Sequence, residues 1–295
     1  MVQDIIKGVG VALITPFNNY MVDYDSLGRM VDYVIAGGVD YIVALGSTAE
    51  TATLSLKERD EVLRFIINRT DGRVPIVAGM GSNNTADLVE QLHSFNLDGV
   101  VAILSVVPYY NKPSQEGIYR HFMAVADASP VPVIIYNVPG RTGLNMTAAT
   151  TLRLAHATPK IVAIKEACGN IEQMQAILDG RPEDFLVLSG DDGITVELVK
   201  RGGDGVISVA ANAFPERFCG CVHNAMKGNI ALAESEIAEL TPAIDLLFKE
   251  GNPTGVKAMT AAMGITRSEV RLPLVEGTEN LAADIKSAIA RYELK

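Results

Sequence analysis

Apolar and polar residues follow one another along this chain in blocks, with a short apolar run and then a longer amphipathic segment. The apolar runs are rich in β-branched residues and strand-sized, which is typical of strands buried on both faces of a parallel sheet. We count eight runs: Val9–Thr15, Tyr41–Leu45, Pro75–Ala78, Val100–Val107, Val133–Tyr136, Ile161–Lys165, Phe185–Ser189 and Gly205–Val209. The segments between them have helical spacing: Ser26–Ile35, Lys57–Asn68, Thr85–Phe95, Glu116–Ala126, Thr147–Ala155, Ile171–Leu178, Ile194–Lys200 and Pro215–Met226.

A strand followed by a helix, repeated eight times, predicts an α/β fold of the parallel (β/α)8 barrel type. A doubly wound open sheet is the alternative. The number of repeats favours the barrel, and so does the lack of a GxGxxG motif after the first run.

The strand pattern stops near Gly228. The residues beyond it predict three helices, Ile230–Lys249, Pro253–Met263 and Glu279–Tyr292, with Pro273 and Gly277 interrupting the chain before the last one. We therefore expect a catalytic barrel over residues 1–228 and a small helical C-terminal domain over residues 229–295.

Composition narrows the class of protein. The chain has 295 residues, 48% of them hydrophobic and 20% charged, as expected for a globular enzyme with a large core. No apolar stretch reaches membrane length and the first residues do not resemble a signal peptide. Three cysteines give no disulfide framework, and a net charge of −10 argues against nucleic-acid binding. A cytoplasmic protein that binds neither membrane nor nucleic acid is expected.

Lys165 is the most informative candidate for chemistry. It ends a buried strand, and burial disfavours the ammonium form and lowers the pKa of a lysine. A neutral amine attacks carbonyl groups, so a Schiff base is the expected chemistry. The strand alone also fits a structural lysine paired with a carboxylate, so the decision rests on the other strand ends.

The other strand ends carry groups that suit imine chemistry. Tyr136 ends the preceding strand and can move protons at the same centre. Ser47 and Thr48 offer hydroxyl and backbone N–H groups for a small carboxylate, and Arg141 can hold a second carboxylate.

A metal site is not expected at these strand ends. All four histidines, His93, His121, His156 and His223, fall on predicted outer helices. We interpret Asp191 and Asp192, the remaining candidates for a metal, as helix N-cap residues.

These motifs resemble the pyruvate-dependent class I aldolase superfamily that includes dihydrodipicolinate synthase and N-acetylneuraminate lyase. Residues 46–50 (GSTAE) are similar to its pyruvate-carboxylate motif, and residues 136–139 (YNVP) and Lys165 to its tyrosine and lysine motifs. Within the superfamily, residues 108–117 (PYYNKPSQEG), 141–143 (RTG) and 189–192 (SGDD) look like the dihydrodipicolinate synthase family.

The resemblance implies a role for each matching residue. Lys165 would form an imine with pyruvate, with no other cofactor and no metal. Tyr136, Ser47 and Tyr110 would relay protons through their hydroxyl groups, with Tyr110 entering from a neighbouring subunit of a homotetramer, a dimer of dimers.

The same resemblance implies a substrate site. Thr48 would bind the carboxylate of pyruvate and Arg141 that of L-aspartate 4-semialdehyde, while Gly190 and the carbonyl of Ile207 would lie beside the reacting groups. The implied enzyme is a lyase, a 4-hydroxy-tetrahydrodipicolinate synthase of the diaminopimelate and lysine pathway. The alternative is a sugar-acid aldolase, such as N-acetylneuraminate or 2-keto-3-deoxygluconate lyase, which would not need Arg141.

Several positions depart from the family pattern. Ser47 stands where threonine is usual, and Ala49 replaces a glycine, which raises a question about the backbone there. The family's allosteric lysine site is matched by Asn83 and Tyr109, but Asp87 replaces a glutamate.

Leu56 and Arg59 stand in that lysine site in place of residues that are often histidine or aromatic. A shorter carboxylate and an added cation should weaken the binding of a cationic effector. Weak or no inhibition by lysine is expected.

Overall fold

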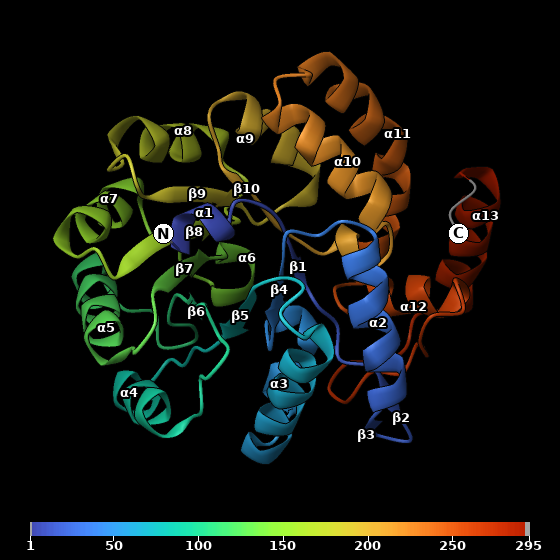
Figure 1. The fold of residues 1–295 in the computed structure, drawn as a ribbon, viewed down its shortest axis with the longest axis horizontal. Coiled ribbons are helices and arrows are strands. Elements are labelled where there is room, and N and C mark those ends of the chain that lie inside the picture. The colour runs from blue at the N-terminus through green and yellow to red at the C-terminus, as the bar shows by residue number, and fades with distance from the viewer. Residues whose placement is uncertain (1, 293–295) are drawn as a thin grey trace.

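Eight parallel strands close into a barrel at the centre of the computed structural model, which describes residues 2–292 (Figure 1). The hydrogen-bonded order is β1-β10-β9-β8-β7-β6-β5-β4, and β4 pairs with β1 to close the ring. The strands are β1 (Gly8–Ala12), β4 (Tyr41–Ala44), β5 (Ile76–Gly79), β6 (Ala102–Val106), β7 (Val133–Asn137), β8 (Ile161–Glu166), β9 (Leu186–Ser189) and β10 (Gly205–Ser208). The predicted barrel is thus confirmed, and the open sheet is not.

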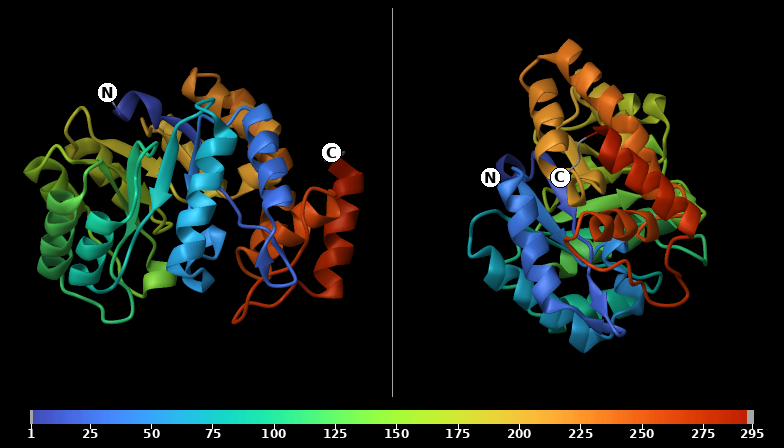
Figure 2. Two further views of the ribbon diagram at one scale, coloured as in Figure 1. Left: turned by 60° about the horizontal axis from the view of Figure 1, so that its bottom comes forward. Right: turned by 90° about the vertical axis from the view of Figure 1, so that its right-hand side faces the viewer.

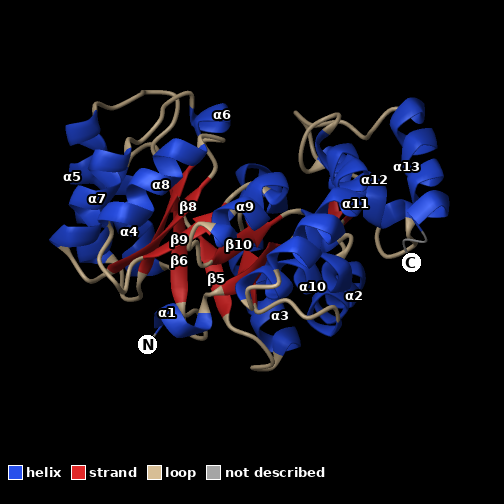
Figure 3. Cartoon of the chain, turned by 90° about the horizontal axis from the view of Figure 1, so that it is seen from above, coloured by secondary structure: helices blue, strands red, loops and turns tan. Residues whose placement is uncertain are grey.

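Helices surround the strands on the outside of the barrel (Figure 3). They are α2 (Tyr24–Ala36), α3 (Leu56–Thr70), α4 (Thr85–Ser94), α5 (Gln115–Ala128), α7 (Ala148–Ala157), α8 (Ile171–Gly180), α9 (Thr195–Lys200) and α10 (Pro215–Met226). Side-chain caps begin most of them. Ser55, for example, accepts from the Glu58 N–H while the Glu58 carboxylate accepts from the Ser55 N–H, a complete capping box.

Two apolar clusters make up the core of the protein. The larger one joins the outer faces of the strands to the helices, and the smaller one occupies the interior. Tyr41 belongs to the inner cluster and is fully buried. A Cβ atom at Gly10 on the adjacent strand would come within 2.2 Å of the Tyr41 ring, so this position has to be glycine.

Short elements escaped the sequence pattern. They are α1 (Val2–Ile5), the hairpin of β2 (Phe17–Asn18) and β3 (Met21–Val22), α6 (Pro139–Thr142), and the 3-10 turns η1 (Ser47–Ala49), η2 (Thr51–Thr53), η3 (Asp192–Ile194) and η4 (Ala210–Asn212). Each is two to four residues long, too short to show a period. Four of them, α6, η1, η3 and η4, follow directly on barrel strands, where the candidate site lies.

The last three helices are α11 (Ile230–Phe248), α12 (Thr254–Ala262) and α13 (Glu279–Tyr292). They lie together at one side of the barrel, next to α10 and α2 (Figures 1 and 2). Their bounds agree with the three predicted helices to within one residue at each end. We keep the division near residue 228 as a proposal; the predicted domain also includes residues 293–295, which lie outside the described part.

Candidate active site

Lys165 and Tyr136 lie side by side at the carboxyl end of the barrel. β7 and β8 pair in parallel with Tyr136 opposite Lys165, and the lysine Nζ lies 4.3 Å from the centre of the tyrosine ring. Both residues are buried: Lys165 is 5% exposed and Tyr136 is 8% exposed. The sequence placed them on consecutive strands, and the closed sheet makes consecutive strands neighbours.

The surroundings of Lys165 favour its neutral form. The pKa of its ammonium group is lowered to about 8, chiefly by burial; the Asp192 anion opposes this fall and the Arg141 cation adds to it. The amine is therefore a far better nucleophile near neutral pH than an exposed lysine.

Asp192 is not the helix cap that the sequence suggested. Asp191 is the cap, because its carboxylate accepts from the Gly193 N–H at 2.9 Å. The Asp192 side chain instead turns into the protein, where it is 2% exposed and accepts from the N–H groups of Val209 and Ala210. Burial raises the pKa of this carboxyl to about 6.

Ser47 and Thr48 form the η1 turn directly after β4. Thr48 is buried, and its hydroxyl accepts from the Asn252 side-chain N–H at 3.0 Å. The turn ends at Glu50, whose φ of 54° makes it the left-handed residue here. Ala49 is not among the residues with positive φ, so the Cβ that replaces the usual glycine is accommodated without backbone strain.

A cavity of about 270 Å³ brings most of the predicted residues together. Lys165, Tyr136, Ser47, Thr48, Arg141 and Gly190 all line it. A Cβ atom at Gly190 would lie 3.1 Å from Lys165 Cε, so glycine here leaves room for the lysine. Ile207 is buried in β10 and is not among the lining residues. We call this space the catalytic cavity.

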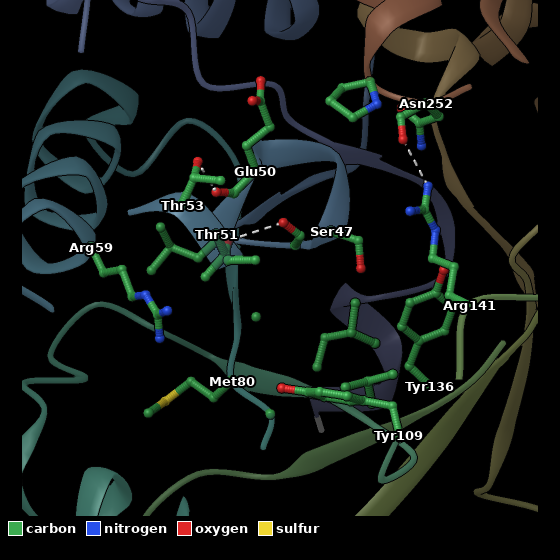
Figure 4. Close-up of a pocket in the computed structure, with 18 of the residues that line it drawn as sticks. Ser47, Glu50, Thr51, Thr53, Arg59, Met80, Tyr109, Tyr136, Arg141 and Asn252 are labelled. Carbon is green, nitrogen blue, oxygen red and sulfur yellow. Dashed lines mark hydrogen bonds between the residues drawn. The ribbon is translucent and has the colours of Figure 1, made fainter. Parts of the chain in front are cut away.

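A second cavity of about 380 Å³ opens beside the first and shares Ser47, Tyr136, Arg141 and Asn252 with it. Figure 4 shows Arg59 on the side of this space away from Arg141, Tyr109 next to Tyr136, and Arg141 donating to the Asn252 carbonyl, at 2.9 Å. We call this space the outer cavity.

The residues matched to an allosteric lysine site do not all gather there. Tyr109, Leu56 and Arg59 line the outer cavity, whereas Asn83 and Asp87 are not among its lining residues. The Asp87 carboxylate instead accepts from Ser82 and Gln91.

Tyr110 lies apart from the other catalytic candidates within one chain. It is 88% exposed, has a φ of 71° and lines neither cavity. Its side chain is therefore exposed to solvent in the single chain.

Sequence reasoning missed two groups of supporting residues. Asn252, from the loop before α12, bonds both Thr48 and Arg141. On the outer side of β8, the buried Glu166 carboxylate accepts from Asn137 and Gln173. Burial raises the pKa of Glu166 and these hydrogen bonds oppose the rise. The alternation of faces along β8 puts Lys165 inward and Glu166 outward, which was the one signal available.

Three observations bear on other kinds of site. Among residues 2–292, no three His, Cys, Asp or Glu side chains gather closely enough to hold a metal ion. All four histidines lie on outer helices, as expected. No helix in the described part of the chain combines the length and apolar character that a membrane crossing requires.

Comparison with known proteins places this site in a family. Residues 5–291 match the model of the Dihydrodipicolinate synthetase family. The chain belongs to this family. The 4-hydroxy-tetrahydrodipicolinate synthase of Phocaeicola vulgatus is 53% identical over 93% of each chain. The expected family is thereby confirmed.

Solved structures agree with this family assignment. A dihydrodipicolinate synthase from Acinetobacter baumannii, described as chloride-inhibited and complexed with pyruvate, has a TM-score of 0.95 at 37% identity, over 98% of this chain and 100% of that one. An enzyme from Cyanidioschyzon merolae with lysine bound has a TM-score of 0.94 at 36% identity, over 99% of each chain. Both share the barrel architecture over nearly the whole chain.

Proposed function

We propose that Lys165 forms a Schiff base with pyruvate and that the resulting enamine attacks the aldehyde of L-aspartate 4-semialdehyde. The enzyme itself is a lyase, a 4-hydroxy-tetrahydrodipicolinate synthase, as its family and its 53% identical relative show. It therefore serves lysine and diaminopimelate biosynthesis. The observation that carries the proposed mechanism is a buried lysine, with a pKa of about 8, beside Tyr136 in the catalytic cavity.

The chemistry uses the imine as an electron sink. Condensation of the Lys165 amine with the pyruvate ketone releases one water, and loss of a methyl proton then gives the enamine. The enamine forms the new carbon–carbon bond while the aldehyde oxygen takes up a proton. The amine of the semialdehyde then displaces Lys165 and closes the ring. No redox or metal step is needed for this balance, so we propose that the protein uses no cofactor.

Hydroxyl groups would move the protons in these steps. The ring of Tyr136 lies beside Lys165, and Ser47 lines the same cavity. Burial raises the pKa of the Tyr136 phenol and the Arg141 cation opposes the rise, so the phenol is present as an acid. We assign the third hydroxyl of the relay to Tyr110 of a neighbouring subunit, in keeping with its exposure.

Two residues that line the catalytic cavity would bind the two substrate carboxylates. Thr48 is assigned to pyruvate and the Arg141 guanidinium to the semialdehyde, with Gly190 lining the same cavity beside Lys165. The carbonyl of Ile207 remains a candidate contact on β10. An arginine is the feature that a second substrate with a carboxylate requires, whereas a sugar aldehyde does not.

The assembly and location are further parts of the proposal. A homotetramer built as a dimer of dimers would bring Tyr110 of one subunit to the cavity of another. A cytoplasmic location is supported by Cys168, Cys219 and Cys221, which are all free thiols in the structure. For the lysine site we keep Asn83, Asp87 and Tyr109 as candidates and expect weak inhibition.

The decisive experiment is covalent trapping. The protein is incubated with pyruvate and borohydride, its intact mass is measured, and the trapping is repeated after L-aspartate 4-semialdehyde has been added. We expect a pyruvate adduct on Lys165 that the semialdehyde depletes. No adduct would refute the Schiff-base mechanism, and an adduct that the semialdehyde leaves untouched would refute the assigned second substrate.

A further inference from the structure

A fully buried ion pair joins the C-terminal helices to the turn that carries Ser47 and Thr48. The Lys257 Nζ lies 2.5 Å from Glu50 Oε1, and the two side chains are 0% and 1% exposed. Glu50 ends the η1 turn and Lys257 lies on α12. Neither residue has a part in the imine chemistry described above.

The remaining polar atoms of the pair are also satisfied. Lys257 Nζ donates to the Glu269 carbonyl at 2.9 Å and lies 4.0 Å from the centre of the Phe17 ring. The second Glu50 oxygen accepts from the Arg271 N–H at 2.9 Å. Taking two charges out of water is costly, so such a pair is weak evidence for a gain in stability, and it has a use where it fixes one arrangement of the segments it joins. The question is which arrangement this pair defines.

Both members of the ion pair are linked to residues around the Thr48 hydroxyl group. Glu50 is two residues beyond Thr48 in the same turn, and its N–H donates to the Ser47 carbonyl at 3.1 Å. On the other side, the Lys257 N–H donates to the Pro253 carbonyl, which directly follows Asn252. Asn252 donates to the Thr48 hydroxyl at 3.0 Å. The ion pair thus connects the two segments that hold this hydroxyl.

The direction of the Glu50 side chain fits a structural role at the turn. Figure 4 shows its carboxylate turned away from the outer cavity, whereas Ser47 faces the open space. Substrate therefore does not need to touch the carboxylate. Burial lowers the pKa of Lys257 to about 8 and the Glu50 charge opposes this, so the ammonium form prevails at neutral pH.

We propose that Glu50 and Lys257 are positioning residues that fix Thr48, and with it the seat of the pyruvate carboxylate, against the C-terminal helices. This inference rests on the proposed function, since it takes Thr48 as the pyruvate seat. It predicts that loss of the pair weakens the capture of pyruvate much more than it slows the later steps.

The test compares three variants at a temperature where each is folded. Lys257→Met removes the cation, and Glu50→Gln keeps the shape and the acceptor for Arg271 but removes the charge. Arg181→Met is the matched control. It breaks another largely buried pair, Arg181–Asp204, beside the start of β10 and far from the carboxyl ends of the strands.

We expect the KM for pyruvate to rise at least tenfold in Lys257→Met and severalfold in Glu50→Gln, with kcat at saturating pyruvate changed less than threefold. The yield of borohydride adduct at low pyruvate should fall in parallel. Arg181→Met should lower the melting temperature and leave both kinetic values unchanged. If Lys257→Met does not fold, the Glu50→Gln result decides.

Two results would overturn the proposal: an unchanged KM for pyruvate in the folded variants, or a rise matched by Arg181→Met. Failure of the proposed function is separate, because it would show as a wild-type protein that forms no pyruvate adduct at all.

Discussion

The rate of pyruvate capture should rise with pH on the acid side of its profile, which we call the acid limb. The position of this limb is a quantitative test of the lowered pKa of the buried Lys165. Lowering the pKa of Lys165 from 10.5 to about 8 raises its neutral fraction at pH 7 from about 0.03% to about 10%, roughly 300-fold. The rate of adduct formation should therefore climb about tenfold per pH unit up to pH 7 and level off above about 8.

Substitution of Asp192 tests whether the charges around Lys165 set its pKa. Its carboxylate is the anion that opposes the fall in the Lys165 pKa, so Asp192→Asn should lower that pKa further. If the Lys165 pKa falls from about 8 to about 7, the neutral fraction at pH 7 rises about fivefold. The acid limb should move to lower pH.

The assay is rapid mixing with pyruvate, followed by borohydride quenching and intact mass, from pH 6 to pH 9.5. Asp191→Asn is the matched control, because Asp191 is the exposed neighbour and asparagine caps a helix as well as aspartate does. The control should keep the wild-type limb. A limb near 10.5 in the wild type, or a shift to higher pH in Asp192→Asn, would refute the reasoning.

Four further outcomes are expected. Lys165→Met should abolish the adduct. It should also raise the free energy of unfolding below pH 8 by up to ~3 kcal/mol, because the buried ammonium group destabilises the wild type there. This gain should fade as the pH rises from about 8 to 10.5, which denaturant unfolding at several pH values would detect. Tyr136→Phe should slow adduct formation about 10²-fold or more in the quenched assay, and a wild-type rate would remove the phenol from the proton path. Arg141→Ala should leave the adduct intact but raise the KM for the semialdehyde at least tenfold, and an unchanged KM would point to a sugar-acid aldolase. Added lysine should inhibit weakly or not at all, and a submillimolar inhibition constant in steady-state assays would contradict this.

Much of the fold and the reacting centre could be predicted because both depend on local patterns. Each strand is a contiguous apolar run, and the carboxyl ends of parallel barrel strands meet at one face. Lys165 and Tyr136 could therefore be brought together from their strand numbers alone. The buried position of Asp192 could not be predicted in this way, because an aspartate after a strand can also be an exposed helix cap. Its neighbour Asp191 is such a cap.

The supporting contacts were out of reach for a different reason. Asn252 meets Thr48 across 204 positions in the sequence, and Lys257 meets Glu50 across 207. No period or spacing relates such residues, and a lysine on a helix is usually exposed. The sequence predicts the bounds of α12, but these bounds do not reveal which face of the helix packs on the barrel.

The C-terminal helices therefore have a physical reason to be part of the enzyme. A barrel places side chains at its mouth from eight strand ends, and several of the turns that follow the strands are only three or four residues long. Here the η1 turn has three residues and no side-chain cap. Contacts from outside the barrel help to fix its position, through Asn252 in the loop before α12 and Lys257 on α12. A buried charge pair suits this task, because a shift of either segment would leave a buried charge without its partner, which is strongly destabilising.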